Sequence, residues 1–247
     1  MTQSVKVAAL LAFRDEASCL PGFFAHLRDY VAEFIVFDDS SRDESFAIAQ
    51  RQPRTHVLRR ETSESFPDHY FEVDNRLALL QAAIERKIDW VLCCDADERH
   101  EQKFLRDLPQ IIAAYREPLG LRVRDLWDRC DQYRVDGFWR NKAKFILFPV
   151  TPIADYYPSH ALHTRWVPPG LQCREENILD YNLYHLVSLR KTNRHARLEK
   201  FKEIDPGNIY QPKIGYDYLA DETSLEVEKI PSGRGFEILP EDAELLQ

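Results

Sequence analysis

The stretch Phe34-Ile35-Val36-Phe37-Asp38-Asp39-Ser40-Ser41 decides the fold, because a short run of β-branched and aromatic residues ends there in two acids and gives way to a longer amphipathic segment. Short runs of this kind predict strands, and amphipathic segments predict helices. The pattern recurs through the first half, with strands expected at 5–12, 34–37, 56–58 and 90–94 and helices at 21–30, 41–50 and 72–86. This alternation is typical of an α/β domain with a largely parallel sheet.

The second half of the chain has a different pattern. Strands are expected at 119–126, 144–148 and 181–187 with long loops between them, and a helix at 103–115 is expected to break at Pro109. A basic helix is expected at 190–202, and the segment 217–247 holds nine acidic and two basic residues. We interpret these two as solvated faces that pair with each other. The 247 residues show no repeat or clear linker, which predicts one domain.

Composition excludes several classes of protein. A content of 44% hydrophobic and 30% charged residues is that of an ordinary globular chain. The net charge of -8 disfavours an extended nucleic-acid interface. Five cysteines without CxxC spacing indicate free thiols rather than a zinc site or a disulfide framework. No apolar run is long enough to span a bilayer and no signal-peptide cleavage site follows the first one, so we expect a cytoplasmic protein.

Common catalytic motifs are missing as well. The chain has only eight glycines and contains neither GxxxxGK nor GxGxxG, so a phosphate-bearing ligand is not expected to lie in a Gly-rich loop. The absence of GxSxG and HExxH argues against the commonest serine hydrolases and zinc peptidases.

Two acidic clusters carry the chemistry that the sequence does offer. Asp38-Asp39 ends the second expected strand, and Asp95-Ala96-Asp97-Glu98 follows the fourth, so both clusters face one crevice at the carboxyl edge of the sheet. Two carboxylates spaced D-x-D can hold Mg²⁺ or Mn²⁺, which commonly bridge protein carboxylates to substrate phosphates. The alternative is that the first cluster caps a helix at Ser41, in the S-x-x-E form of a capping box, and that the second opens a loop.

The sequence resembles the inverting, family 2-like glycosyltransferases of the GT-A fold. The resemblance rests on the segment 36–45, Val-Phe-Asp-Asp-Ser-Ser-Arg-Asp-Glu-Ser, which is similar to the V-D-D-G-S-x-D-x-S of the family, and on the D-x-D of 95–97, extended to D-x-D-E by Glu98. It implies a Rossmann-like, mostly parallel central sheet with helices on both faces and a loop-rich C-terminal acceptor half. It also implies a nucleotide-sugar-binding half at 1–117, an acceptor-side half at 118–216 and an acidic tail at 217–247.

The resemblance assigns roles to individual residues. In the family, the loop after the first strand and the first acidic cluster hold the base and ribose of the nucleotide, and the D-x-D contacts ribose and metal. The residues implied for the nucleotide are Phe13, Glu16, Asp38, Asp39, Asp95 and Ala96. Asp95 and Asp97 are implied for the metal, and a C-terminal histidine, here His185, often completes its coordination. A core role for His185 is the competing interpretation.

Three departures from the family pattern are visible. The P-x-Y-N-E of the family is 11–16 here, Leu-Ala-Phe-Arg-Asp-Glu, which keeps only an aromatic residue and the final Glu, and Ser40 stands where the family has Gly. The Q-x-x-R-W of processive synthases lacks its Gln at 162–166. We therefore expect transfer of a single sugar rather than polymerisation. Arg76 is expected to meet a phosphate or ribose, with a plain surface arginine as the alternative.

The acceptor side is predicted from residue chemistry. An inverting transfer needs a base that takes the proton of the acceptor hydroxyl. The expected base is Glu175 or Glu176, with Asp136 and Asp155 as rivals. Trp139, His163 and Trp166 are expected to shape the acceptor pocket, since aromatic faces stack on the apolar faces of sugars, although each alone fits a core position equally well.

These observations predict a metal-dependent glycosyltransferase that uses Mn²⁺ or Mg²⁺ to move one sugar from a nucleotide diphosphate sugar to a saccharide or other hydroxyl acceptor. One alternative is a haloacid-dehalogenase-like phosphatase. That family needs Thr or Val two places after the second Asp, where this chain has Arg99, and has its D-x-D after the first strand rather than the fourth. The other alternative is a non-catalytic nucleotide-sugar-binding module.

Overall fold

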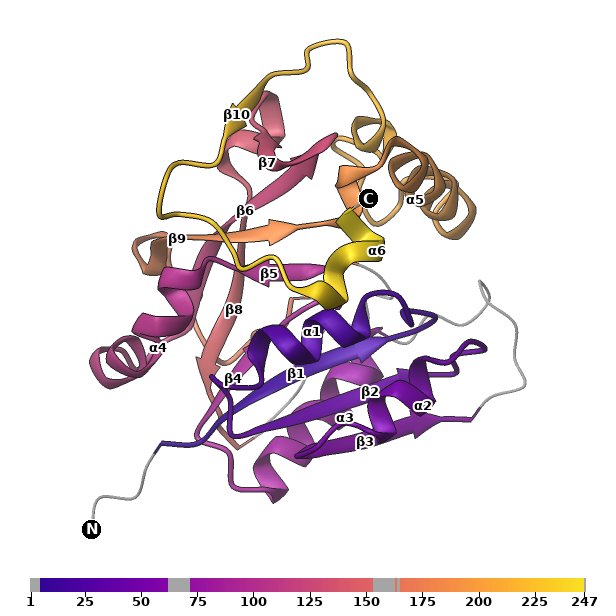
Figure 1. Cartoon of the computed structure of the whole chain (residues 1–247). Coiled ribbons are helices and arrows are strands. Elements are labelled where there is room, and N and C mark those ends of the chain that lie inside the picture. The colour runs from indigo at the N-terminus through magenta and orange to yellow at the C-terminus, as the bar shows by residue number, and fades with distance from the viewer. Residues whose placement is uncertain (1–4, 62–71, 153–162, 164, 247) are drawn as a thin grey trace.

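Four parallel strands form the N-terminal part of one curled sheet (Figure 1). The structure is a computed structural model that describes residues 5–61, 72–152, 163 and 165–246. In it β1 (Val7–Phe13) lies between β2 (Glu33–Asp39) and β4 (Trp90–Cys93), and β3 (Thr55–Arg60) adds to the far side of β2. The expected strands therefore form and are parallel, and their carboxyl ends share one edge of the sheet.

The second half of the chain extends this sheet with strands of mixed direction. The strands are β5 (Glu98–His100), β6 (Leu119–Trp127), β7 (Arg129–Arg134), β8 (Ala143–Pro149), β9 (Ile178–His185) and β10 (Val227–Lys229). β8 joins β4 in antiparallel fashion and β6 and β7 follow, while β9 runs parallel to β6 and pairs with β5. The sequence did not predict β5, β7 and β10. All three are short and polar, so the apolar pattern that indicates a strand is missing.

Helices cover both faces of the sheet, as expected. The helices are α1 (Leu20–Leu27), α2 (Ser45–Gln50), α3 (Glu72–Glu85), α4 (Gln102–Ala114), α5 (Lys191–Ile204) and α6 (Ala243–Leu246). Alternate side chains of β1 point to opposite faces, so Ala9 and Leu11 pack against α1 and α4 while Ala8 and Leu10 pack against α3. Short 3-10 helices occur at η1 (Gly137–Asn141), η2 (Glu175–Asn177), η3 (Val187–Leu189), η4 (Asp217–Leu219) and η5 (Pro240–Asp242).

Two expectations about helices are wrong. The second helix begins at Ser45 rather than at 41, and the side chain of its N-cap residue Glu44 makes no capping hydrogen bond, so the capping box does not form. Helix α4 continues through Pro109, which lies on its exposed side. A stripe of buried side chains holds this helix on the sheet, so packing outweighs the lost backbone hydrogen bond.

The acidic C-terminal segment is built into the fold rather than left as a solvated tail. β10 pairs with β7 at the sheet edge, and the chain then crosses β9 and ends in α6 beside α1 (Figure 1). The expected pairing between the basic helix and this segment is confirmed in part, because Arg194 of α5 forms an ion pair with Glu222 at 2.9 Å. None of the helices among the described residues has the length and apolar character needed to cross a membrane.

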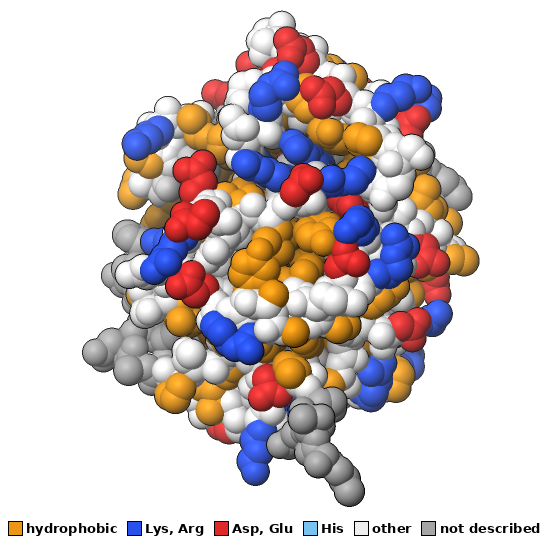
Figure 2. All heavy atoms as spheres, turned by 90° about the vertical axis from the view of Figure 1, so that its left-hand side faces the viewer, with side chains coloured by type: hydrophobic (Ala, Val, Ile, Leu, Met, Phe, Trp, Pro, Cys, Tyr) orange, Lys and Arg blue, Asp and Glu red, His pale blue; other side chains and the backbone are white. Residues whose placement is uncertain are grey.

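Hydrophobic side chains also gather on one outer face of the molecule. Figure 2 shows them near the centre of the face on the left of Figure 1, with Lys, Arg, Asp and Glu side chains around them. The arrows of β1, β2 and β3 point to the right in Figure 1, so this face lies on the opposite side of the molecule from the carboxyl ends of these strands.

Candidate active site

A cavity of about 750 Å³ opens at the carboxyl ends of β1, β2 and β4. Its walls come from the loop after β1, the end of β2, α3, the D-x-D segment, β8, the end of β9 and α5. Most of the residues predicted from the sequence meet here: Phe13, Glu16, Asp39, Arg76, Asp95, Ala96, Asp97, His163, Trp166 and His185. The strand ends bring together side chains that are far apart in the sequence.

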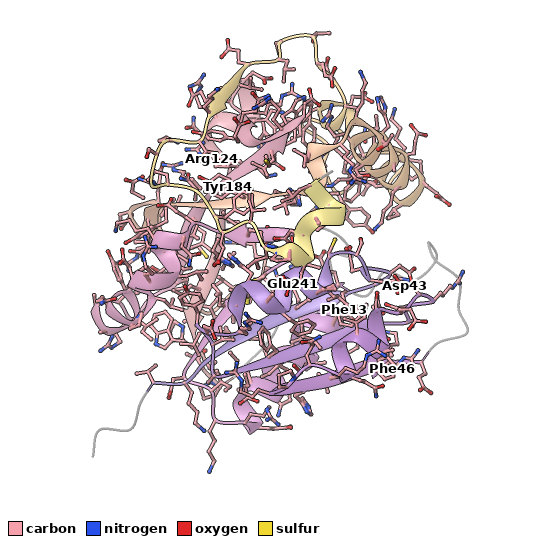
Figure 3. All side chains as sticks on the ribbon, viewed as in Figure 1. Phe13, Asp43, Phe46, Arg124, Tyr184 and Glu241 are labelled. Atoms are coloured by element: carbon pink, nitrogen blue, oxygen red, sulfur yellow. The ribbon has the colours of Figure 1, made fainter. Side chains whose placement is uncertain are left out.

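The loop after β1 is held in place by the segment that follows β2. The backbone N–H of Asp15 donates to Ser41 Oγ at 3.0 Å, and that of Glu16 donates to Ser45 Oγ at 2.8 Å. The carboxylate of Asp43 accepts from the N–H of Ala17 at 3.1 Å. Figure 3 shows Phe13 and Asp43 at this same edge of the sheet. The Ser and Asp side chains of the family motif thus fix the loop that carries Glu16, instead of capping a helix.

The two acids of the first cluster have different surroundings. Asp39 lines the cavity, and its Oδ1 accepts from Arg60 Nε at 3.1 Å. Asp38 is fully buried, accepts from the N–H of Ser41 at 3.0 Å and pairs with Arg59 at 3.0 Å. Asp38 does not line the cavity, so its expected contact with the nucleotide is not supported. Alternation along the strand explains the difference, because neighbouring side chains point to opposite faces.

Arg76 of α3 faces the cavity and is buried. It pairs with Glu72 one turn earlier in the helix, and its guanidinium lies 4.6 Å from the centre of the Trp166 ring. One of its terminal nitrogens, Nη1, is buried and has no hydrogen-bond partner among the described residues. A buried N–H of this kind favours an anionic or carbonyl oxygen of a ligand. Arg76 is therefore not a plain surface arginine.

Lys144 of β8 binds the first acid of the D-x-D. Its Nζ donates to Asp95 Oδ2 at 2.6 Å and to both carboxylate oxygens of Glu98 at 2.9 and 3.0 Å. Glu98 also accepts from the N–H of Asp95 at 2.8 Å, which closes the turn between them. Although burial disfavours the charged carboxylate, Lys144 keeps the pKa of Asp95 below its usual value. The side chain of Asp95 still exposes 47% of its surface, whereas that of Glu98 exposes 3%.

The second acid of the D-x-D faces His185. Asp97 Oδ2 lies 3.0 Å from His185 Nε2, and the other ring nitrogen, Nδ1, lies 2.7 Å from Asp125 Oδ1. Burial opposes the charged imidazolium, but Asp97 and Asp125 outweigh it and raise the pKa of His185 to about 9. His185, at the end of β9, therefore lies between the carboxylate of Asp97 in the D-x-D and the carboxylate of Asp125 in β6.

Comparison with known families adds a finding that the geometry alone does not give. Residues 9–161 match the family described as glycosyl transferase family 2, which is more than half of the chain. The chain belongs to this family. The expectation drawn from the two acidic motifs is thereby confirmed. The phosphatase alternative finds no support in this family 2 chain, because Arg99 at the position that would need Thr or Val is fully buried and paired with Asp242.

Individual relatives match only parts of the molecule. A TPR repeat-containing protein of Synechococcus elongatus is 34% identical over 93 residues. This match covers 38% of the present chain and 21% of that protein. A structure of glucosyl-3-phosphoglycerate synthase from Mycobacterium tuberculosis with Mn²⁺, uridine diphosphate and glucosyl-3-phosphoglycerate is 17% identical, with a TM-score of 0.36 over 49% of this chain and 44% of that one. A 4-diphosphocytidyl-2C-methyl-D-erythritol synthase structure is 13% identical, with a TM-score of 0.39 over 59% and 75% of the two chains. Likenesses of this size say nothing about the substrates of this family 2 chain.

Asp97 and His185 are close enough together that both could bind one divalent cation. Neighbouring ligands that are each about 2.1 Å from an octahedral ion lie about 3 Å apart, and the separation of Asp97 Oδ2 and His185 Nε2 is 3.0 Å. Asp125 on Nδ1 is the outer carboxylate that typically orients a metal-bound histidine. The described residues contain no group of three or more His, Cys, Asp or Glu side chains arranged to hold a metal. Further ligands would therefore come from substrate oxygens and water, as is usual for Mg²⁺.

Two cavity residues of this family 2 chain can accept a proton. Burial raises the pKa of Glu16 to about 7, with the negative charge of Asp97 acting in the same direction. His163 Nε2 lies 3.0 Å from Tyr216 Oη, which donates to Asp205 Oδ2 at 2.9 Å. Because a carboxylate only accepts, the Tyr216 oxygen takes a hydrogen from His163 Nε2 and leaves Nδ1 as an acceptor. Burial lowers the pKa of His163, which favours this neutral form.

Helix α5, which the sequence predicted as a basic helix, supplies a basic wall of the cavity. Asn193, Arg197 and Lys200 follow one another at spacings of four and three residues, and all three line the cavity. Arg197 Nη1 is buried without a hydrogen-bond partner among the described residues. The helical spacing of these side chains was the signal that could have singled them out.

The predicted catalytic pair does not line the cavity. Glu175 and Glu176 lie in η2 before β9, whereas His185 is at the other end of this strand. Eight residues of strand cover roughly 23 Å or more, so neither glutamate reaches the cavity. Asp136, the rival, is bound by both Arg134 Nε and Nη2 at 2.7 and 2.8 Å and lies outside the cavity. Asp155, the second rival, falls outside the described residues.

Trp139 is also misplaced by the sequence prediction. It is 3% exposed and packs against Trp127 in a hydrophobic cluster, with ring centres 5.8 Å apart, and it does not line the cavity. His163 and Trp166 do line the cavity, although most of the loop that precedes them falls outside the described residues. Trp139 is thus a core residue rather than one of the aromatic residues that line the cavity.

Proposed function

We propose that this family 2 chain is a glycosyltransferase that moves one sugar from a nucleotide diphosphate sugar to an acceptor hydroxyl, with inversion at the anomeric carbon. The observation that carries the proposal is that the D-x-D carboxylates and the basic wall of α5 line the same cavity. A diphosphate needs cations on its oxygens as its charge grows during bond cleavage. The positively charged side chains that line this cavity can meet that need without a Gly-rich loop.

The nucleotide half of the donor would lie against β1, β2 and α3. Asp39 is held by Arg60 and faces the cavity, so its second oxygen can accept from the ribose or the base. Phe13 closes the floor at the end of β1. Arg76 Nη1 and Arg197 Nη1, which have no hydrogen-bond partner among the described residues, can donate to phosphate oxygens.

A divalent cation held by Asp97 and His185, with Asp95 beside them, would act as a Lewis acid toward the departing diphosphate. His185 has to release its Nε2 proton to serve as a ligand, and Asp125 would then keep the Nδ1 proton in place. Lys144 holds Asp95 in position and adds positive charge at the same end of the cavity.

The transfer requires that the acceptor hydroxyl lose its proton as its oxygen bonds to the anomeric carbon, while the electron pair of the broken bond leaves with the diphosphate. Among the described residues that line the cavity, Glu16 and His163 are the candidates that we propose for the base that takes this proton. The variants Glu16→Gln and His163→Asn separate them, because only loss of the base removes the rise of rate with pH. An acceptor-side role for Trp166 remains part of the proposal.

The deciding experiment uses Asp97→Asn. Wild type is incubated with a panel of UDP- and GDP-sugars and MnCl₂, with water or a saccharide as acceptor, and the released nucleotide is measured. We expect the variant to lose roughly 100- to 1000-fold in rate and to stay folded. Asp29→Asn is the control, since the Asp29 side chain is 80% exposed at the end of α1.

Each alternative predicts a different result in the same experiment. A phosphatase would form a phosphorylated Asp95 with a phosphate monoester, which mass spectrometry detects. A binding module would be stabilised by UDP or GDP against thermal unfolding yet release no nucleotide from the sugars. Undiminished release by Asp97→Asn would contradict the role of Asp97.

A further inference from the structure

Arg99, two residues beyond the D-x-D, has a fully buried guanidinium. Its Nη1 donates to the backbone carbonyl oxygens of Ala96 and Glu98, each at 2.8 Å. Its Nη2 donates to Asp242 Oδ1 at 2.6 Å and points to the carbonyl of Cys19 at 3.4 Å. One side chain thus connects the D-x-D turn, the start of α1 and the C-terminal segment.

The carbonyl groups that Arg99 binds belong to the turn that sets the direction of both catalytic-site carboxylates. Ala96 lies between Asp95 and Asp97, and the N–H of Glu98 donates to the carbonyl of Asp95 at 3.1 Å. Without the guanidinium, the carbonyls of Ala96 and Glu98 would each lose a charged donor inside the protein. The turn would then be free to rotate its peptide groups, and the carboxylates would move with them.

Asp242 is the counterion that makes this arrangement possible. It comes from η5, 143 residues further along the chain, and is itself fully buried. A buried guanidinium without a carboxylate would be costly, so Asp242 keeps Arg99 at this depth. The neighbouring residue Glu241 is labelled in Figure 3, where the C-terminal segment lies beside α1.

Gly22 of α1 leaves room for the pair. A Cβ atom at this position would lie 1.9 Å from Asp242 Oδ1 and 2.4 Å from Arg99 Nη2. Any other residue would therefore displace the carboxylate or the guanidinium. Three segments, α1, the D-x-D turn and η5, are shaped around this one contact.

We propose that Asp242 is a positioning residue for the D-x-D, and that the C-terminal segment 240–246 braces the active site through Arg99. The inference rests on the proposed transferase function and adds to it a dependence on a residue that lies 143 positions beyond Arg99 in the sequence. Asp242 touches neither substrate nor metal. It acts by holding the arginine that fixes the backbone between Asp95 and Asp97.

A role confined to fold stability predicts something different. A buried ion pair adds little net stability, and its loss destabilises the whole molecule without preference for one turn. The brace predicts a local effect at 95–98. The pair Arg134–Asp136 is the matched control, because it is also a buried Arg–Asp pair but lies outside the cavity.

The experiment compares Asp242→Asn, Gly22→Ala and the control Asp136→Asn in the full chain. Amide hydrogen exchange of Asp95 and Glu98 is measured first, without any ligand, together with urea unfolding. We expect the hydrogen-exchange rate of these two amides to increase in Asp242→Asn and Gly22→Ala. The increase should be at least ten times that in a control variant with the same free energy of unfolding. Nucleotide release from the sugar panel with MnCl₂ should fall about 10- to 100-fold in kcat, with KM changed less than threefold, as for outer residues of metal sites.

Chemical rescue tests the same contact from the other side. Asp242→Ala leaves space for a small carboxylate beside Arg99, so sodium formate should restore the slow exchange at Glu98, and sodium chloride at equal ionic strength should not. Exchange and kcat like those of Asp136→Asn would overturn the brace. If wild type releases no nucleotide from any sugar, the transferase function fails, and the exchange and rescue results still decide whether Asp242 braces the turn.

Discussion

Ser40 offers a sharp test, because it stands where the family has Gly and its backbone has φ of 65°. This left-handed conformation costs an ordinary residue about 1 to 2 kcal/mol relative to Gly. The Ser40 hydroxyl donates to the carbonyl of Arg60 at 2.8 Å, and Arg60 in turn binds Asp39. A hydrogen bond of this kind contributes about 1 kcal/mol.

These magnitudes predict different results for two substitutions. Ser40→Ala loses the hydrogen bond and keeps the left-handed backbone, so it should lower the free energy of unfolding by about 1 kcal/mol. Ser40→Gly loses the same hydrogen bond but removes the energetic cost of the left-handed backbone. The unfolded chain is more flexible with Gly, which cancels about 0.5 to 1 kcal/mol of this stabilisation. We therefore expect the Gly variant to unfold within about 0.5 kcal/mol of wild type.

Urea unfolding followed by tryptophan fluorescence measures these differences. Lys87 is the matched control, because it has φ of 57° just after α3 and its side chain is exposed. The amide of Ile88 donates to the carbonyl of Ala83, as in a Schellman motif, where Gly is preferred. Lys87→Gly should be more stable than wild type by up to about 1 kcal/mol. Equal stability of Ser40→Ala and Ser40→Gly would refute the reasoning.

The remaining predictions concern the carboxylates. The pKa of Glu16 is raised from 4.5 to about 7 in the folded protein. The free energy of unfolding of wild type should therefore fall relative to that of Glu16→Gln as the pH rises from 4.5 to 7. An equal pH dependence of the two proteins over this range would contradict the prediction. Carboxyl NMR titration should place Glu16 near 7, and Asp97→Asn should lower that value, since the Asp97 charge raises it; an unchanged titration would show that Asp97 has no influence. The double variant Glu175→Gln with Glu176→Gln should release nucleotide within twofold of the wild-type rate, and a loss above tenfold would restore these residues as candidates for the base.

The sequence determined the family and the core of the fold. Alternating apolar runs and amphipathic segments predicted β1 to β4 and the helices between them. The runs of β1, β2 and β4 are apolar because these strands are buried on both faces. The sequence also predicted which residues lie at the carboxyl ends of the strands. Parallel strands bring their carboxyl ends to one edge, so Asp39, Asp95 and Asp97 could be placed together from order alone.

Only the tertiary structure decided which charged residues reach the cavity. Asp38 and Asp39 are neighbours in sequence, yet one is enclosed by Arg59 and the other faces the cavity. Glu175 and Glu176 had suitable chemistry and lie at the wrong end of β9. Asp242 looked like one more acid of a solvated tail and is fully buried against Arg99. The physical reason is that charge and polarity are local properties of a sequence, whereas burial and ion pairing depend on which distant segment packs against each side chain.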